Sequence, residues 1–157
     1  MSFAYSSKWF LSVVVGFAGL LALAQSGSAE EVRVTVAVVL ATDQNKKVDP
    51  DLKRIAQEIQ KIEPALTGFR LGQITRKSVQ VGEKAAFGLV DQEVATVLVV
   101  HGANEKNKVG LTVKPPHMGE VTYTTCCDKF FPIVTRYQTN NKEWLILAIR
   151  VQPCKGK

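Results

Sequence analysis

Four side chains in the sequence have the chemistry for thiol or metal catalysis, namely Cys126, Cys127, His101 and His117. A reactive cysteine needs a neighbouring base, a helix N-terminus or a Cys-x-x-Cys arrangement that stabilises its thiolate. The two cysteines are adjacent instead, and the negative charge of Asp128 beside them opposes thiolate formation. The spacings between these cysteines and histidines match no recognised zinc pattern, so we predict neither a metal nor a cofactor.

Other catalytic motifs are missing from the sequence, including GxSxG, HExxH and a phosphate-binding glycine loop. Asp91 and Glu93 lie at a predicted turn, where a structural role explains them. The strongest surface signal is aromatic: Tyr137 and Trp144 are predicted to face each other near Arg136. These three residues are a candidate recognition surface, although a cross-strand aromatic pair also commonly stabilises a hairpin without binding anything.

Residues 1–29 have the order of an export signal, with Lys8 before a run of about 16 apolar residues and small residues at the end. We predict cleavage after Ala29, with Ala24 as the alternative. The apolar run is shorter than the roughly 20 residues that a membrane-spanning helix needs. The chain is therefore expected to be exported to the periplasm, cell envelope or medium, and to be held at a membrane only if the signal stays uncleaved.

The remaining residues, 30–157, are predicted to form a single domain. The whole sequence has a formal net charge of +6. Its lysines and arginines are scattered, without a run of five or a stripe interleaved with aromatic residues, which argues against a nucleic-acid partner. A cationic surface of this kind suits an envelope protein or an acidic polymer as partner.

The pattern of apolar residues predicts an α+β domain. Residues 31–41 alternate valine with other residues, as in a buried strand. Asp49 is a predicted helix N-cap, Pro50 suits the first helical position, and Pro64 ends the helix. One side of this helix is an apolar stripe, comprising Leu52, Ile55, Ala56, Ile59 and Ile62.

From residue 68 onward strands and turns follow, with Gly72 as a candidate β-bulge. The expected order is strand, helix and strand followed by a β-meander, so that one amphipathic helix packs on a mainly antiparallel β-sheet. The alternative for the helix is that its apolar stripe lies on a membrane surface.

The last two strands are predicted to form a hairpin with Asn140-Asn141 as a two-residue loop. Counting outward from that loop pairs Tyr137 with Trp144 and, further along, Cys127 with Cys154. Directly opposed cysteines lie close enough for a disulfide, and an exported protein meets oxidising conditions. The hairpin therefore predicts a Cys127–Cys154 disulfide.

The same register places Cys126 on the inner side of the strand, reduced and packed as a small apolar side chain. Phe130, Pro132 and Val134 would share that inner face with Leu145 and its alternate neighbours on the last strand. A bulge at Pro132 or Pro153 would shift the register by one residue, so a Cys126–Cys154 disulfide stays open as the alternative.

Most of residues 32–151 resembles a group of uncharacterised exported bacterial domains that are common in planctomycete-type genomes. The resemblance implies a small α+β domain of the envelope or medium, and it implies no reaction and no functional residue. The stretches that carry it are VDPDLKRIAQEI, FRLGQITRKSVQVGEKAAFGLVDQ, VGLTVKPP and FFPIVTRYQTNNKEWLILAI.

Two functional hypotheses follow. The first is an exported, non-enzymatic binding or structural module of the cell envelope that acts through protein–protein contacts. The second is a thiol-redox or metal-binding enzyme that uses Cys126 and Cys127 with His101 and His117.

Overall fold

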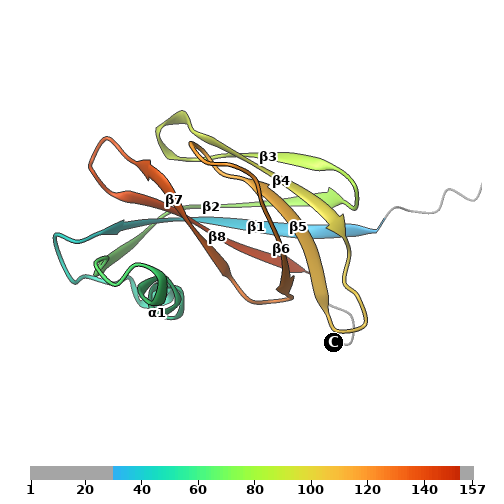
Figure 1. The fold of residues 1–157 in the computed structure, drawn as a ribbon, viewed down its shortest axis with the longest axis horizontal. Coiled ribbons are helices and arrows are strands. Elements are labelled where there is room, and N and C mark those ends of the chain that lie inside the picture. Colours follow the sequence, from blue (N-terminus) through green and yellow to red (C-terminus); the bar gives the residue numbers. More distant parts are fainter. Residues whose placement is uncertain (1–29, 153–157) are drawn as a thin grey trace, which may run out of the picture.

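The computed structural model describes residues 30–152 of the chain. They form two antiparallel sheets that are stacked face to face, with one α-helix on the outside of the first sheet (Figure 1). The first sheet has the order β2-β1-β8-β7 and the second the order β3-β4-β5-β6. The fold is thus α+β-like but mainly β, and the strands make two sheets where the sequence predicted one.

The strands of the first sheet are β1 (Glu31–Thr42), β2 (Gly68–Gln80), β7 (Phe131–Gln138) and β8 (Trp144–Gln152). Those of the second are β3 (Lys84–Gly88), β4 (Val94–His101), β5 (Lys108–Lys114) and β6 (Val121–Cys126). Between β1 and β2 lie a 3-10 turn η1 (Pro50–Leu52) and the helix α1 (Lys53–Ile62), and a second 3-10 turn η2 (Val90–Gln92) precedes β4. The predicted export signal and Cys154 lie outside the described residues.

Strand β1 is buried from Val34 to Ala41, and from Ala37 onward both of its faces are covered. Its even-numbered residues from Val32 to Leu40 point to the second sheet and belong to the core between the sheets. Its odd-numbered residues Ala37, Val39 and Ala41 pack against α1. Gly72, the predicted bulge, is skipped in the pairing of β2 with β1, as expected.

Strand β8 is the second central strand and has the same double burial. Leu145, Leu147 and Ile149 face the second sheet, and Ile146 and Ala148 face the helix. All five side chains are fully enclosed. Burying a leucine or isoleucine side chain stabilises the fold by about 1.5–3 kcal/mol, so the β1–β8 pair supplies much of the apolar burial.

The helix packs its apolar stripe on the first sheet, since Leu52, Ile55 and Ile59 are buried there. Ile62, at the helix end, is 57% exposed and lies outside that contact. Pro50 occupies the first turn as predicted. Asp49 makes no side-chain capping bond, however, and the prediction of an N-cap is wrong in this respect.

Asp49 is drawn away from the helix by strand β2. Its amide donates a hydrogen bond to the Phe69 carbonyl (3.0 Å), and its carboxylate accepts one from the Leu71 amide (2.7 Å). The segment before the helix is thereby tied to the start of β2 and cannot turn its carboxylate toward the first helical turn.

The hairpin between β7 and β8 has a three-residue loop, so the predicted two-residue loop is wrong. The Thr139 amide donates to the Glu143 carbonyl and the Lys142 amide donates to the Thr139 carbonyl, each at 2.8 Å. Lys142 has a φ of 60°. A type I turn that ends in a left-handed residue is the usual geometry of three-residue hairpin loops.

A further irregularity between Val134 and Gln138 shifts the register of the hairpin. Gln138, and not Tyr137, lies opposite Trp144, and Val134 lies opposite Ile146 in place of Leu147. The predicted faces are therefore exchanged on β7. Ile133 joins the core between the sheets, while Phe130 and Val134 pack toward the helix side.

The adjacent cysteines do not lie in this hairpin. Cys126 is the last residue of β6, and its side chain is exposed, which contradicts its predicted place in the core. Cys127 is half-buried in the turn before β7, where Asp128 donates its amide to the Val151 carbonyl (3.2 Å). The turn is thus beside the end of β8, and the Cys127–Cys154 pairing stays a prediction because Cys154 lies outside the described residues.

Tyr123 on β6 packs against the core between the two sheets and provides a test of that packing. Its ring stacks on Phe131 with centroids 4.1 Å apart, its hydroxyl is buried without a hydrogen-bond partner, and burial raises its pKa above the usual 10.0. We expect Tyr123→Phe to leave stability at pH 7 unchanged or to raise it by up to about 2 kcal/mol, because an unsatisfied buried hydroxyl is removed.

The same substitution should change the response to alkali. Above pH 10 the unfolded chain ionises this tyrosine while the folded chain holds it neutral, so the wild type loses stability as the pH rises. Urea unfolding between pH 8 and 11 should show a smaller loss for Tyr123→Phe. An equal loss in both proteins would contradict the buried, unpaired hydroxyl.

Candidate functional site

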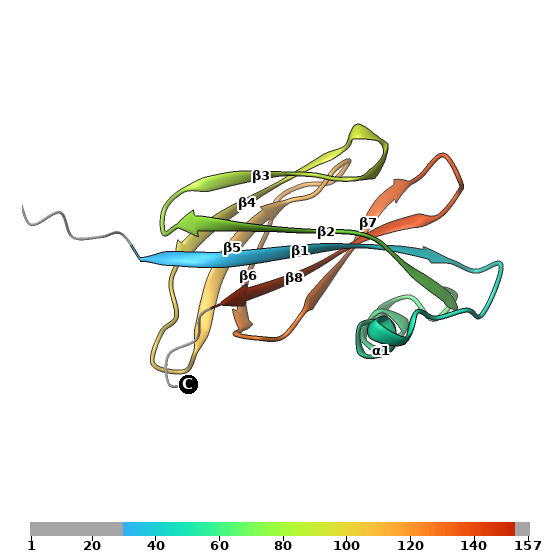
Figure 2. The same ribbon diagram turned by 180° about the vertical axis from the view of Figure 1, so that it is seen from behind.

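Three loops meet at one end of the sandwich, and we call this surface the loop end. They are residues 89–93 between β3 and β4, 115–120 between β5 and β6, and 139–143 between β7 and β8. Figures 1 and 2 both show these connections close together, away from the end where β1 begins. The loop end thus combines segments from both sheets.

Side chains bond the three loops to one another. The Tyr137 hydroxyl donates to Asp91 Oδ2 (3.1 Å), and the Asn140 amide donates to the same oxygen (3.0 Å). Glu93 Oε1 lies 3.1 Å from His117 Nε2, and the His117 ring stacks on Tyr137 at 5.0 Å between centroids. Each loop therefore has a fixed position relative to the other two.

The backbone of the loop end adopts conformations that non-glycine residues seldom take. Asp91, Gln92, His117 and Lys142 have φ values of 56°, 62°, 56° and 60°. A left-handed conformation costs an ordinary residue about 1–2 kcal/mol. Such residues persist where the surrounding contacts hold them, and they occur often at binding and catalytic sites.

The electrostatics of the loop end favour a neutral Tyr137. Desolvation raises the pKa of its hydroxyl, and the hydrogen bond to Asp91 and the charges of Asp91 and Glu93 raise it further. The phenol therefore stays protonated and acts as a donor at neutral pH. Arg136, the residue before Tyr137 in β7, is exposed.

The structure brings together some of the predicted recognition residues and separates others. Tyr137 contacts two loops of the loop end, through Asp91 in one and His117 in the other. Arg136 precedes it in β7 and is exposed. Trp144 does not lie at the loop end, because it packs half-buried against the apolar cluster between the first sheet and α1.

Asp91 and Glu93 are functional candidates that the sequence pattern assigned to turn formation alone. Their partners are 24 or more positions away in the chain, so local pattern carried no signal for them.

The residues of the alternative enzyme are not gathered at one place. His101 ends β4, with Nδ1 2.8 Å from the Gly102 carbonyl, and lies at the same end of the second sheet as Cys126. His117 lies in the loop at the opposite end of that sheet. Among residues 30–152 no group of three or more His, Cys, Asp and Glu side chains has an arrangement that could hold a metal ion.

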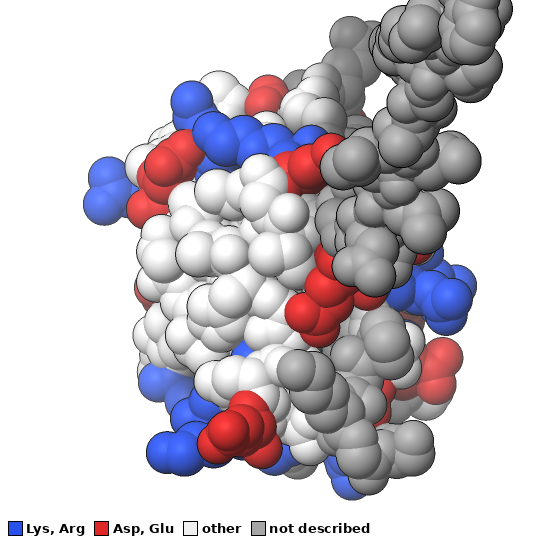
Figure 3. Space-filling model, turned by 90° about the vertical axis from the view of Figure 1, so that its right-hand side faces the viewer, with Lys and Arg blue, Asp and Glu red and all other residues white. Residues whose placement is uncertain are grey.

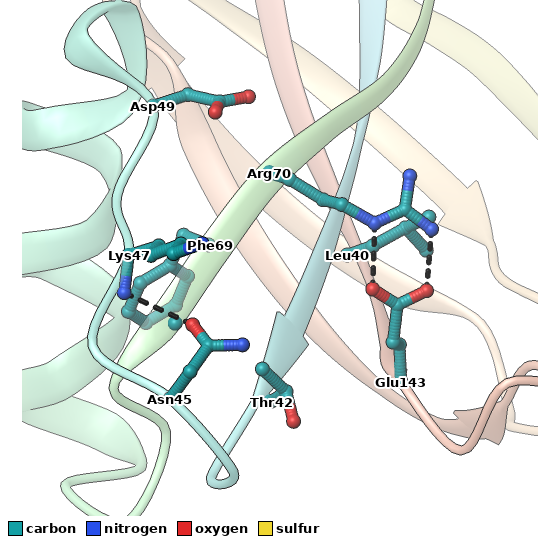
Figure 4. A pocket seen from close by; sticks show the side chains of 9 residues that line it. Leu40, Thr42, Asn45, Lys47, Asp49, Phe69, Arg70 and Glu143 are labelled. Carbon is teal, nitrogen blue, oxygen red and sulfur yellow. Dashed lines mark hydrogen bonds and ion pairs between the residues drawn. The ribbon is translucent and has the colours of Figure 1, made fainter.

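A shallow hollow of about 240 Å³ lies beside the start of β2 (Figure 4). Its charged wall is an ion pair in which Arg70 Nε and Nη2 donate to the two Glu143 oxygens at 2.6 and 2.5 Å. The hydrogen bond to Glu143 raises the pKa of Arg70. On the other wall the Asn45 side chain accepts from the Lys47 amide (2.9 Å). The polar groups of both walls are thus already bonded within the protein. The Arg70–Glu143 ion pair connects β2 to the β7–β8 loop.

Within residues 30–152, no helix combines the length and apolar character needed to cross a membrane. Comparison of the chain with models of protein families, with curated proteins and with solved structures gave no match.

Two neighbouring glycine substitutions test whether Asp91 bonds the loops together. Both Asp91 and Gln92 have positive φ, so glycine relieves a similar backbone cost at each position. We expect Gln92→Gly to stabilise the protein by up to about 1 kcal/mol. Asp91→Gly should instead destabilise it, because two hydrogen bonds to the carboxylate are lost. Thermal unfolding of the pair measures the difference, and equal shifts in Tm would show that the Asp91 carboxylate holds nothing.

Thiol labelling tests the placement of the cysteines. Exposed Cys126 should react rapidly with a thiol reagent in the native protein, and Cys126→Ser should abolish that signal. If Cys127 and Cys154 form the predicted disulfide, unfolding without a reductant adds no further thiol. Further thiols that appear on unfolding would contradict the bridge, and a native protein without any reactive thiol would contradict the exposed position of Cys126.

Proposed function

We propose that the chain is an exported, non-enzymatic binding module of the cell envelope that contacts a partner protein through its loop end. The observation that carries the proposal is the side-chain bonding between the three loops, centred on Asp91, Tyr137 and His117. A surface that is ordered before it binds loses less conformational entropy on association. Loops on a rigid sandwich are a common way to build such a surface.

The composition of the loop end also suits protein contacts. Tyrosine and arginine are enriched among the residues that contribute most to binding between proteins. Here Tyr137 is half-buried with its ring against His117, and Arg136, the residue before it in β7, is exposed. Asp91 and Glu93 add acceptors whose positions are set by bonds within the protein, so the surface offers donors, acceptors and an aromatic ring in a fixed pattern.

The sheet edges formed by β2, β3 and β7 are less suited to contacts than the loop end. Lys77 and Gln73 on β2 donate side-chain hydrogen bonds to the Ala86 and Gly88 carbonyls, so this edge is bridged to the second sheet. On the other edge of the first sheet, β7 carries Pro132 and a register shift. Charged side chains, proline and irregular pairing all disfavour the addition of a foreign strand.

The predicted export signal in residues 1–29 and the resemblance to exported bacterial domains support the cellular location in this proposal. Cell fractionation gives a direct test of it. The full-length chain, produced in its source organism, should appear in the envelope or medium as a shortened form that begins near Glu30. A full-length protein confined to the cytoplasm would contradict the export part of the proposal.

Site-specific photo-crosslinking tests the partner contact. A photoreactive residue at Arg136 should give discrete cross-linked products in intact cells, whereas one at Lys53 on the exposed side of α1 should not. Adding Tyr137→Ala should reduce the Arg136 products at least several-fold, because the ring that shapes the surface is removed. Equal products from both positions, or products that Tyr137→Ala leaves unchanged, would overturn the loop end as the contact surface.

A further inference from the structure

A second surface lies on the outer side of the first sheet, beyond the reach of the helix. Figure 2 shows α1 beneath one end of this sheet, while the half of β1 toward its beginning carries no helix. The odd-numbered residues of β1 face outward, and the helix contacts begin at Ala37. Arg33 and Thr35 therefore lie on the uncovered half.

Pairing with the neighbouring strands brings two more arginines to this place. Thr35 lies opposite Arg76 on β2 and opposite Arg150 on β8. Arg33 lies two residues away from Thr35 on the same side of β1. The arginine face is this group of Arg33, Arg76 and Arg150 around Thr35, and it draws on three strands that are far apart in the sequence.

The three guanidinium groups have no carboxylate partner among the described residues. The ion pairs in that part of the chain are Lys61–Glu58, Arg70–Glu143 and His117–Glu93. Arg33 and Arg76 are exposed. Arg150 is half-buried, lies 4.9 Å from the Phe130 ring, and has a buried Nε without a hydrogen-bond partner. Hydrogen bonds between a guanidinium and an anion are stronger than those between neutral groups, so an anion on this face would gain from positive charges that have no carboxylate partner.

Carboxylates and neutral groups surround the arginine face. At the end of the molecule where β1 begins, acidic and basic side chains are interspersed around a largely uncharged surface (Figure 3). In the pairing, Arg33 lies between Ser78 and Gln152, which add neutral polar groups. Two carboxylates lie at its margin. Glu31 is two residues before Arg33, and Asp128 accepts a hydrogen bond from Gln152 Nε2 (2.6 Å). Thr35 at the centre is only 1% exposed, as expected where long arginine side chains on both sides cover it.

The spacing of the arginines suits phosphate groups. Strands in a sheet lie about 4.8 Å apart and rise about 3.4 Å per residue, so Arg76 and Arg150 are about 10 Å apart and Arg33 lies about 7 Å along β1. Arginine side chains can converge over such distances. The planar guanidinium matches the oxygens of a phosphate with two parallel hydrogen bonds.

We propose that the arginine face binds phosphate groups carried by an extended polymer without bases, such as polyphosphate or a polyol phosphate. The face is an open part of a sheet and not an enclosed pocket, which favours a chain that passes across it over a small molecule. Base stacking, on which single-stranded nucleic acids rely, has little support here because Arg150 already occupies the neighbouring Phe130 ring. The proposal is independent of the loop end.

The test measures binding of long-chain polyphosphate to the exported protein by titration calorimetry at several salt concentrations. The double variant Arg33→Gln with Arg76→Gln removes two exposed charges, and the matched control Lys53→Gln with Arg54→Gln removes two exposed charges from α1. We expect the arginine variant to lose at least tenfold in affinity and the control less than threefold. The slope of log Kd against log salt should fall by about 1.4–1.8 in the arginine variant, since each of the two lost phosphate contacts contributes roughly 0.7–0.9.

Comparison ligands define the remaining outcomes. Inorganic phosphate should compete weakly, because it lacks the linked groups of the polymer. Equal losses in both double variants, or no binding by the wild type, would overturn the arginine face as a site. Equal or tighter binding of single-stranded DNA, of polyglutamate or of vesicles with anionic phospholipids, lost in the same arginine variant, would overturn the phosphate polymer as its ligand. Tyr137→Ala should leave polyphosphate binding unchanged, which separates this result from the loop end.

Discussion

The double burial of the β1–β8 pair is the constraint on which the rest of the structure depends. Both strands are covered by the second sheet on one side and by α1 on the other, so their side chains are apolar on both faces where the helix lies. Neither strand can slip by one residue without moving apolar side chains to solvent. The positions of the helix, of both edge strands and of the β7–β8 loop follow from this pair.

The two proposed surfaces are consequences of where that burial ends. On the outer side of the first sheet the helix contacts begin at Ala37, and the same strand presents Arg33 and Thr35 just before them. At the end where β3, β5 and β7 finish, the loops have no sheet above them and are held by side-chain bonds around Asp91. A partner protein at the loop end and a phosphate polymer at the arginine face would thus contact two regions that different parts of the structure hold in place.

Much of the fold could be predicted from local pattern, because β1, the helix and Gly72 show their roles within short stretches. The valine alternation of β1, the stripe from Leu52 to Ile59 and the bulge at Gly72 are all found in the structure. The hairpin register could not be predicted, since the extra loop residue Lys142 and the irregularity before Gln138 leave no mark in the apolar pattern. The bonding of Asp91 and Glu93 to Tyr137 and His117 depends on how the two sheets stack, which the sequence alone does not reveal.

Native-state hydrogen exchange tests the central claim most directly. If the β1–β8 pair holds the structure together, the amides of Val36, Val38 and Leu147 should exchange only through global unfolding, with the full free energy of unfolding. The amides of β3 and β6 at the sheet edges should open at lower free energies. Exchange of the β1 and β8 amides through local opening, while those of β4 and β5 stay protected, would contradict the claim.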